Sequence, residues 1–210
     1  MTLFGIFGAG GCGRGILPLV RAALTPGAEA VFVDDADLGR RINGARRLTF
    51  DEFAGADDRA ICLAVANGAV REKLAQRCAD AGLPFFSAIA KQHILMDQVA
   101  IGEGALISPY TTLTSNIRVG RHFHLNHYSY VEHDCIIGDF VTFAPGVKCN
   151  GNIHIEDHAY IGTGAVLRQG TPSKPLRIGR GATVGMGAVV TKDVPAGEVW
   201  AGNPARPLRR

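Results

Sequence analysis

The amino-acid sequence predicts a small α/β domain with a short parallel sheet, followed by a parallel β-helix. Three observations lead to this prediction. Segments with strand and helix spacing alternate in the first half, an apolar residue recurs at every sixth position in the second half, and 27 of the 210 residues are glycine. We place the α/β domain at residues 1–92 and the β-helix at residues 97–210.

The first domain is predicted from alternating apolar patterns. Short apolar runs suited to buried strands are Leu3–Gly8, Ala30–Val33, Ala60–Ala66 and Pro84–Phe86. Apolar residues at helical spacing fill two of the intervals, Arg14–Leu24 and Val70–Cys78. The order strand, helix, strand, present twice, is typical of a small parallel sheet covered by helices.

The β-helix is predicted from a six-residue period that starts at Val99. The third residue of each six is apolar in twelve successive repeats, and these residues are Ile101, Ile107, Leu113, Val119, Leu125, Val131, Ile137, Phe143, Cys149, Ile155, Ile161 and Leu167. If about half of all residues are apolar, a fixed frame gives this by chance roughly once in several thousand sequences. Three hexapeptides make one coil, so residues 18 apart should stack about 4.8 Å from each other, with the apolar side chains inside.

The repeat is interrupted once, after Leu167. Residues Arg168–Leu176 include the turn-forming sequence QGTPSKP, and the apolar period resumes out of phase at Ile178, Val184 and Val190. We expect the interrupting segment to leave the coil as a loop.

Composition excludes several classes of protein. The formal charge of +3 and the absence of a Lys/Arg block argue against nucleic-acid binding, and no apolar run approaches the roughly 18 residues of a membrane span. The five cysteines are scattered, so reduced thiols in a cytoplasmic protein are expected. Cys135 and Cys149 occupy repeat positions that favour small apolar side chains, which indicates a core role.

A glycine-rich loop follows the first predicted strand. Gly8, Gly10 and Gly13 fit the pattern GxGxxG, Gly11 adds a further glycine, and Asp34 follows about twenty residues later. The motif alone indicates dinucleotide binding, because such a loop lets the backbone approach phosphates at a helix N-terminus. A domain of residues 1–92 is nevertheless too short for a full doubly wound dinucleotide fold.

The whole chain resembles the hexapeptide-repeat sugar O- and N-acetyltransferases related to sialic acid O-acetyltransferases. That group includes the N-acetyltransferases of nucleotide-linked 4-amino-4,6-dideoxy sugars. The matching segments are GAGGCGRG, the Asp34-Asp35 pair, ANGAVR, NHYSYVEHDCIIGDF, IGRGATVGMGAVVTKDVPAG and AGNPARPLR. The resemblance implies left-handed coils, an exception to the usual crossover rule, and a homotrimer with active sites between subunits. Acetyl-CoA would lie in the groove between adjacent β-helices.

The same resemblance gives the first domain a substrate. It implies that this domain holds the nucleotide of a sugar nucleotide, which we favour over a purely structural turn and over NAD. The candidate substrate-binding residues are Gly8, Gly10, Gly11, Gly13, Asp34, Asp35 and Asn67. The polar residues among them lie at predicted strand ends, where ordinary loop polarity is the alternative interpretation.

The resemblance also identifies His133, within Glu132-His133-Asp134, as the catalytic base. Acyl transfer from a thioester to an amine needs a base near the nucleophile, and histidine has a suitable pKa range. Asp134, the second predicted catalytic residue, stands where the family often has glutamate and would hold the imidazole tautomer. Its side chain is one methylene shorter, and Glu132 is the other acidic neighbour.

The coenzyme residues are predicted partly from the period and partly from the resemblance. Gly151 is 18 residues after His133, so it should stack over the histidine and leave its backbone N–H open to a ligand. In the family the matching glycine offers its amide to the acetyl thioester. Thr142 stands where some relatives have a histidine that contacts CoA, and Gly162 and Lys192 are further candidates.

A second histidine cluster precedes the predicted base. His122, His124 and His127 lie close in sequence, but no cysteine or acid falls at ligand spacing, so we predict packing or groove-lining roles and no metal site. Asn126 and Tyr128 either face the substrate or pack in turns.

These observations give one leading function and two alternatives. The leading hypothesis is direct, acetyl-CoA-dependent N-acetylation of the 4-amino group of a nucleotide-linked amino-deoxy sugar, in glycan biosynthesis. The nearest alternative is O-acetylation of a sialic acid or similar sugar by the same residues. The other is a non-catalytic, nucleotide-binding trimer, in which loss of His133 would be expected.

Overall fold

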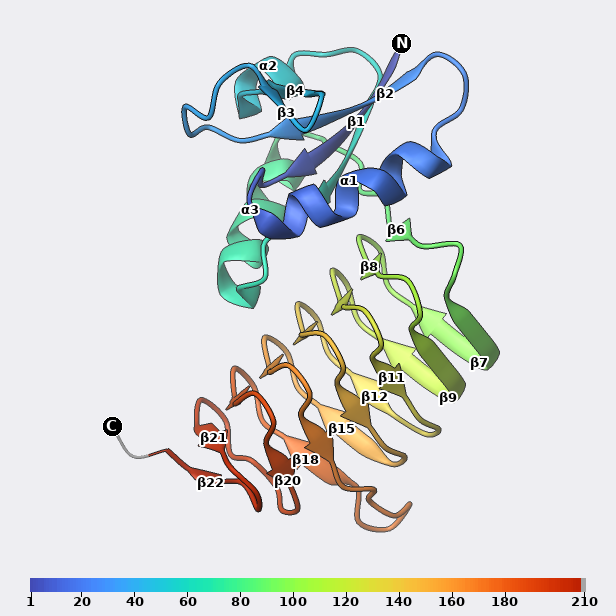
Figure 1. The fold of residues 1–210 in the computed structure, drawn as a ribbon, viewed down its shortest axis with the longest axis vertical. Helices are drawn as coiled ribbons and strands as arrows, with labels where there is room; N and C mark the ends of the chain where they lie inside the picture. Colours follow the sequence, from blue (N-terminus) through green and yellow to red (C-terminus); the bar gives the residue numbers. More distant parts are fainter. Residues whose placement is uncertain (209–210) are drawn as a thin grey trace.

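The computed structural model describes residues 1–208, which form an α/β domain above a β-helix in the view of Figure 1. The elements of the first domain are strands β1 Thr2–Phe7, β2 Ala28–Val33, β3 Arg41–Ile42, β4 Ala45–Leu48 and β5 Arg59–Leu63, and helices α1 Gly11–Ala23, α2 Phe50–Ala54 and α3 Gly68–Asp80. The strand order is β3-β4-β2-β1-β5. Strands β1, β2, β4 and β5 are parallel, as predicted, while β3 and β4 form an antiparallel hairpin.

Apolar residues cover both faces of this sheet because successive side chains of a strand point to opposite sides. In β2, Ala30 and Phe32 pack with α1, whereas Val31 and Val33 pack with α2 and α3. Residues 36–58 add β3, β4 and α2, which the apolar pattern did not predict. The segment Pro84–Phe86, predicted to begin a strand, runs parallel to β5 but is limited to a single bridge between Phe85 and Ile61. Two backbone hydrogen bonds, Ile61 N to Pro84 O at 2.9 Å and Phe86 N to Ile61 O at 3.1 Å, hold it there.

The β-helix is a triangular prism with three strand-bearing faces. The first face carries β6 Ala88–Ile89, β8 Leu106–Ile107, β10 His124–Leu125, β13 Thr142–Phe143, β16 Tyr160–Ile161, β19 Thr183–Val184, β21 Val199–Ala201 and β22 Arg206–Pro207. The second carries β11 Tyr130–Val131, β14 Lys148–Cys149, β17 Val166–Leu167 and β20 Val189–Val190, and the third carries β12 Ile136–Ile137, β15 Ile153–Ile155 and β18 Leu176–Ile178. The longer β7 Ile94–Ile101 and β9 Thr112–Val119 run across both of these faces.

The predicted 18-residue stacking is confirmed. Val131 pairs with Leu113 and Cys149 on the second face, and Ile137 pairs with Val119 and Ile155 on the third. Eleven of the twelve predicted core positions are buried in one apolar cluster, and the twelfth, Ile101, is partly buried against it. Cys135 and Cys149 belong to this core, as predicted. The sheet of the first face already begins at Ala88, ahead of the residue 97 at which the β-helix was expected to start.

The corners of the prism require a left-handed backbone conformation that is mostly supplied by residues other than glycine. Positive φ angles occur every six residues, for example at Asn116 (56°), His122 (54°), Tyr128 (59°) and Asp134 (58°). Asparagine and aspartate tolerate this conformation best, whereas aromatic residues there are strained. Side chains at these corners point outward and stack on equivalent residues of neighbouring coils, as Tyr110 and Tyr128 do with their ring centroids 5.5 Å apart.

The predicted loop after Leu167 leaves the coil and returns in register. Strand pairing joins Ile153 to Leu176 and Val166 to Val189, a separation of 23 residues, which is five more than the 18 of an uninterrupted coil. Thr171 and Lys174 close the loop through reciprocal backbone hydrogen bonds of 3.0 Å.

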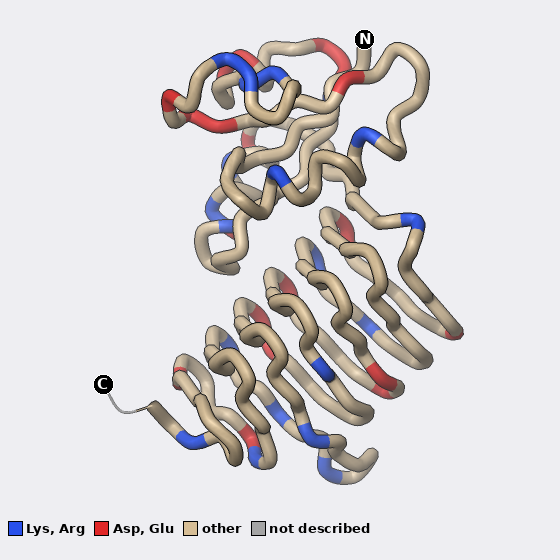
Figure 2. Tube along the Cα trace, in the orientation of Figure 1, with Lys and Arg blue, Asp and Glu red and all other residues tan. Residues whose placement is uncertain are grey.

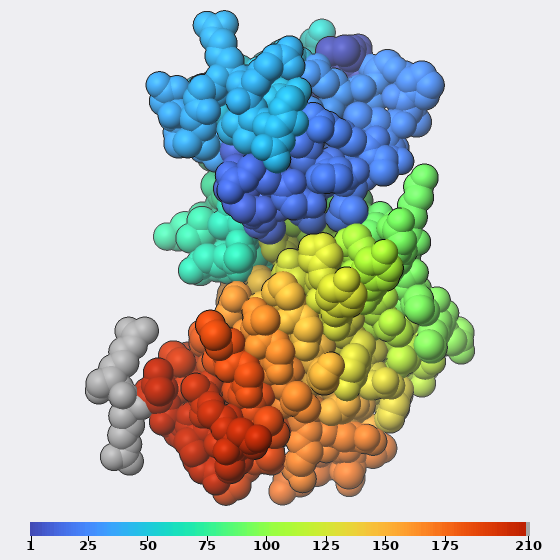
Figure 3. All heavy atoms as spheres, viewed as in Figure 1, coloured from blue at the N-terminus to red at the C-terminus, as the bar shows by residue number. Residues whose placement is uncertain are grey.

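A buried arginine joins the two domains. Arg71, on α3, is fully buried and donates to the carbonyl oxygens of Val65, Ala66, His122, Phe140 and Val141 and to the hydroxyl of Thr142, at 2.6–3.2 Å. The space-filling view shows the resulting direct contact between α3 and the coils (Figure 3). Burial lowers the pKa of Arg71 to about 10.

Candidate active site

The predicted catalytic residues lie at the corner between the second and third faces. His133 follows β11 and precedes β12, and its side chain is partly exposed, as is that of Asp134. Nδ1 of His133 lies 2.7 Å from Oδ2 of Asp134. The shorter acid therefore reaches the imidazole, and this contact assigns the imidazole partner to Asp134 and not to Glu132, whose carboxylate faces Thr114 at 3.5 Å.

Asp134 has a second partner that the sequence analysis missed. Nδ2 of Asn116 donates to Oδ1 of Asp134 over 3.1 Å. The hydrogen bonds from His133 and then from Asn116 lower the pKa of Asp134, which keeps its carboxylate charged. The signal was available, because Asn116 precedes Asp134 by one 18-residue coil.

Gly151 stacks on His133, as the period predicted. A Cβ at Gly151 would lie 2.5 Å from Cε1 and 2.6 Å from Nε2 of the imidazole, so only glycine leaves room for the ring in this position. Among residues 1–208, no protein group accepts a hydrogen bond from the Gly151 N–H, while its carbonyl accepts from Gly170 N at 2.9 Å. This amide therefore has no partner among the described residues, and Gly151 itself is buried beside the imidazole.

The glycines of the first loop divide into two kinds. Gly8 has a φ of +100°, and a Cβ at Gly13 would lie 1.9 Å from the Gly8 carbonyl oxygen, so both are required by the backbone itself. A Cβ at Gly10 or Gly11 would meet nothing within 4 Å. No side chain caps α1 at Gly10, which leaves the first amides of this 13-residue helix open to an anion.

The three predicted polar contacts of the first domain bond to backbone amides. Asp34 accepts from Ala9 N at 2.9 Å and so braces the glycine loop. Asp35 accepts from Phe50 N at 2.8 Å and pairs with Arg77 at 2.7 Å, and these bonds lower its pKa. Asn67 caps α3 by accepting from Val70 N. All three lie where strands β2 and β5 end, at the same edge as the glycine loop.

Two of the three remaining coenzyme candidates, Thr142 and Gly162, lie on or directly after strands of the first face and not at the His133 corner. Thr142 is buried on the first face, where its hydroxyl donates to Ala66 O at 2.8 Å and accepts from Arg71. The expected contact of Thr142 with CoA therefore finds no open surface within this chain. Gly162 is buried in the coil stack, where a Cβ would lie 2.6 Å from Met186 N. Lys192 is exposed two residues after β20, and the strand pairing places it in the same column as His133 and Gly151, three coils beyond His133.

Two of the three histidines in the second cluster, His122 and His124, pack against the first domain. His124 is buried with Nε2 2.8 Å from Leu63 O, and His122 lies between the rings of Phe85 and Phe140. Burial lowers the pKa of both imidazoles, that of His122 to about 4. Residues 1–208 contain no group of three or more His, Cys, Asp or Glu side chains placed to hold a metal ion.

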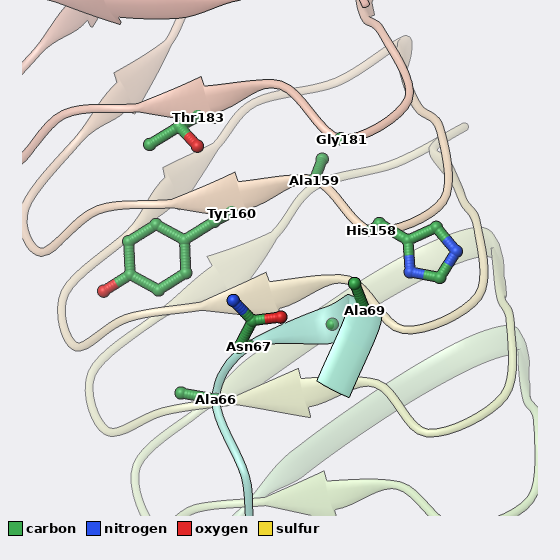
Figure 4. Close-up of a pocket in the computed structure, with 9 residues that line it drawn as sticks. Ala66, Asn67, Ala69, His158, Ala159, Tyr160, Gly181 and Thr183 are labelled. Carbon is green, nitrogen blue, oxygen red and sulfur yellow. The ribbon is translucent and has the colours of Figure 1, made fainter. Parts of the chain in front are cut away.

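A pocket of about 380 Å³ lies between the start of α3 and the first face of the β-helix (Figure 4). Figure 4 shows Asn67 at the start of α3, facing the coils that carry Tyr160 and Thr183. The lining residues are Ala66, Asn67, Gly68, Ala69, His158, Ala159, Tyr160, Gly181 and Thr183. Asn67 was predicted as a contact, and its neighbours Ala66, Gly68 and Ala69 lie in the ANGAVR segment on which the resemblance rests. The lining residues of the coils were not predicted, because they join the pocket only through the contact between the two domains.

A basic hairpin adjoins the end of β2. Figure 2 shows the positive charges of the β3–β4 hairpin, which come from Arg40, Arg41, Arg46 and Arg47. Arg46 is bound to both carboxylate oxygens of Glu29, at 2.6 and 2.9 Å, and Arg47 donates to Asp34 O at 3.0 Å.

None of the helices in residues 1–208 has the length and apolar character that crossing a membrane requires.

Comparisons with known proteins agree with this combination of fold and site. No family model matches the chain. It is 46% identical over 216 residues to the GDP-perosamine N-acetyltransferase of Escherichia coli O157:H7, covering 100% of this chain and 98% of that protein. The structure of WeeI from Acinetobacter baumannii AYE superposes with a TM-score of 0.95 at 53% identity, covering 99% and 100% of the two chains. The acetyltransferase domain of PglB from Neisseria gonorrhoeae FA1090, in complex with acetyl coenzyme A, gives 0.77 at 30% identity and 98% of each chain.

The chain belongs to the hexapeptide-repeat acetyltransferase family. The prediction of an acetyl-CoA-dependent N-acetyltransferase for a nucleotide-linked amino sugar is confirmed, as is the prediction of an α/β domain followed by a left-handed β-helix.

Proposed function

We propose that the chain transfers an acetyl group from acetyl-CoA to the 4-amino group of a GDP-linked 4-amino-4,6-dideoxy sugar, GDP-perosamine or a close relative of it. The observation that carries this choice of substrate is the 46% identity, over the full chain, with the GDP-perosamine N-acetyltransferase of Escherichia coli O157:H7. The His133–Asp134 pair and the free amide of Gly151 supply the groups that the reaction needs.

The proposed chemistry is direct transfer. The sugar amine attacks the thioester carbonyl carbon, and Nε2 of His133 accepts the amine proton while Asp134 stabilises the resulting imidazolium. The Gly151 N–H donates to the carbonyl oxygen as negative charge develops there. The C–S bond then breaks, and the leaving thiolate recovers the proton from His133 to give free CoA.

The two halves of the proposed site face different ways in one protomer, which supports a homotrimer with shared sites. The α/β domain packs on the first face through His124 and Thr142, whereas His133 lies at the corner between the other two faces. A second copy of the chain would bring its glycine loop and its Asp34 towards that corner. Gly10 and Gly11 would admit the diphosphate, and Lys192 remains a candidate contact for CoA.

The test is thiol release from acetyl-CoA with GDP-, dTDP- and UDP-linked 4-amino sugars and with free sialic acid as an alcohol acceptor. We expect activity with the GDP-linked amine and loss of about 10³-fold or more in His133→Ala. Activity confined to sialic acid, or an unchanged rate in His133→Ala, would contradict the proposal. Light scattering measures whether the protein is a trimer. Co-expression of inactive His133→Ala with inactive Gly11→Trp tests whether two subunits share a site. Mixed trimers should regain activity, because some sites then combine an intact His133 from one chain with an intact Gly11 from another.

A further inference from the structure

The side chain of Asn116 lies beside the proposed catalytic pair but has no role in the proposed acetyl transfer. Asn116 lies one coil before Asp134, at the same corner, and both adopt the left-handed conformation with φ of 56° and 58°. Equivalent corner positions in the neighbouring coils are Gln98 and Asn152. Neither of these side chains bonds to a catalytic group among residues 1–208.

The two oxygens of the Asp134 carboxylate have different partners. Oδ2 accepts from Nδ1 of His133 at 2.7 Å, and Oδ1 accepts from Nδ2 of Asn116 at 3.1 Å. The carboxylate is about half exposed, so a single hydrogen bond would leave it free to rotate about its side-chain torsions. Two bonds, one to each oxygen, fix its plane.

From this arrangement we infer that Asn116 is a positioning residue, which acts on His133 through Asp134. With the carboxylate fixed, Nδ1 of His133 carries the proton and Nε2 is the free base, the tautomer that the proposed transfer requires. An amide suits this task because it donates without adding a charge that would compete with the imidazolium for the carboxylate. Asparagine also tolerates the left-handed corner. The inference rests on the proposed function, since it assigns a role within that reaction.

The decisive variant is Asn116→Gly, because glycine removes the amide and accepts the positive φ. We expect kcat to fall about 10-fold, with KM for both substrates within about twofold of wild type. The matched control is Gln98→Gly, at the corner of the preceding coil, which should leave kcat unchanged. Asn116→Asp, of the same shape, should lower kcat at least as much, because a second carboxylate would face Asp134.

A double-mutant cycle tests the route through Asp134. In an Asp134→Gly background, Asn116→Gly should cause no further loss of kcat, because the group on which it acts is gone. An equal 10-fold loss in that background, or a kcat in Asn116→Gly within about twofold of wild type, would overturn the inference. Absence of acetyl transfer in the wild-type enzyme would instead refute the proposed function.

Discussion

Replacing Arg71 by methionine tests the energetics of the contact between the domains. Methionine has a similar length without charge or donors, so it removes the hydrogen bonds while filling most of the space. Arg71 is fully buried, and every one of its partners is a backbone carbonyl or a hydroxyl, with no carboxylate to neutralise it. Such a cation is retained for its directed hydrogen bonds, because burying it carries a desolvation cost.

The expected magnitude follows from which carbonyls lose their donor. Ala66 O keeps Thr142, and Val141 O keeps His124 N, so these two remain satisfied. The carbonyls of Val65, His122 and Phe140 lose the Arg71 donor and have no other among residues 1–208, at about 2 kcal/mol each. Against this, the lowering of the pKa of Arg71 to about 10 indicates a cost of about 3 kcal/mol that methionine does not incur. The net loss is about 3 kcal/mol.

The assay is scanning calorimetry on the intact protein, in wild type and Arg71→Met. For a chain of this size, about 3 kcal/mol corresponds to a fall in Tm of about 6–12 °C. Arg71→Lys keeps the charge but loses the planar fork and should fall between the two. Lys73→Met, at an exposed position of the same helix, is the control and should leave Tm unchanged. A Tm for Arg71→Met within about 2 °C of wild type would refute the reasoning.

Three further predictions concern single residues. Gly151→Ala should displace the imidazole of His133, since the added Cβ would lie 2.5 Å from its ring; we expect about a 100-fold loss of kcat at an unchanged Tm, and a rate near wild type would contradict the stacking argument. Gly13→Ala should lower Tm because its Cβ would lie 1.9 Å from a carbonyl oxygen. Gly11→Ala has room for its Cβ and should leave Tm unchanged, and equal melting of the two variants would show the distinction to be mistaken. The pKa of His122 is lowered by burial to about 4, while the unfolded chain binds this proton near pH 6.5. The contribution of neutral His122 to the free energy of unfolding should therefore be fully present above pH 6.5 and be lost, by up to about 3 kcal/mol, as the pH falls towards 4. Urea titrations of His122→Phe should show a free energy of unfolding that depends less on pH.

The β-helix could be predicted because its geometry follows directly from the spacing of residues along the chain. One coil takes 18 residues, and each face needs one inward side chain, so core positions and stacking partners follow by counting. The same counting gave Gly151 as the neighbour of His133. Applied backwards from Asp134, it would also have given Asn116.

Residues 36–58 resisted prediction because their signals are local and not periodic. Asn43-Gly44, with φ of 46° and 75°, is a tight-turn pair that predicts a hairpin. The flanking Ile42 and Ala45 are single apolar residues between arginine pairs, so no alternating apolar pattern accompanies the turn. Thr49 and Glu52 form a capping box at the start of α2. Edge strands carry charged residues that prevent pairing with other chains. Because these residues interrupt apolar runs, the strands were not predicted from apolar runs.

Several candidate substrate or coenzyme contacts have structural partners within the chain. Asp35 and Asn67 bond to backbone amides of α2 and α3, and Thr142 bonds across the domain contact. The Asn67 bond is local, three residues from Val70, and is the N-cap that asparagine before a helix predicts. The bonds of Asp35 and Thr142 join separate elements, so they depend on distances that no spacing in the chain encodes. The roles of Gly8 and Gly13 were likewise hidden, since a steric requirement and a phosphate-binding loop produce the same glycine pattern.

The place of the inserted loop shows how the β-helix holds its site in register. The loop begins one coil beyond Gly151, close to the His133 corner. Gly170 N still donates to Gly151 O at 2.9 Å, and Leu176 N donates to Asn152 O at 3.1 Å, so pairing closes on both sides of the five extra residues. The insertion therefore extends outward without displacing the coil that carries Gly151. A loop in this position can form a wall beside the site, while the distance between His133 and Gly151 continues to be set by strand spacing alone.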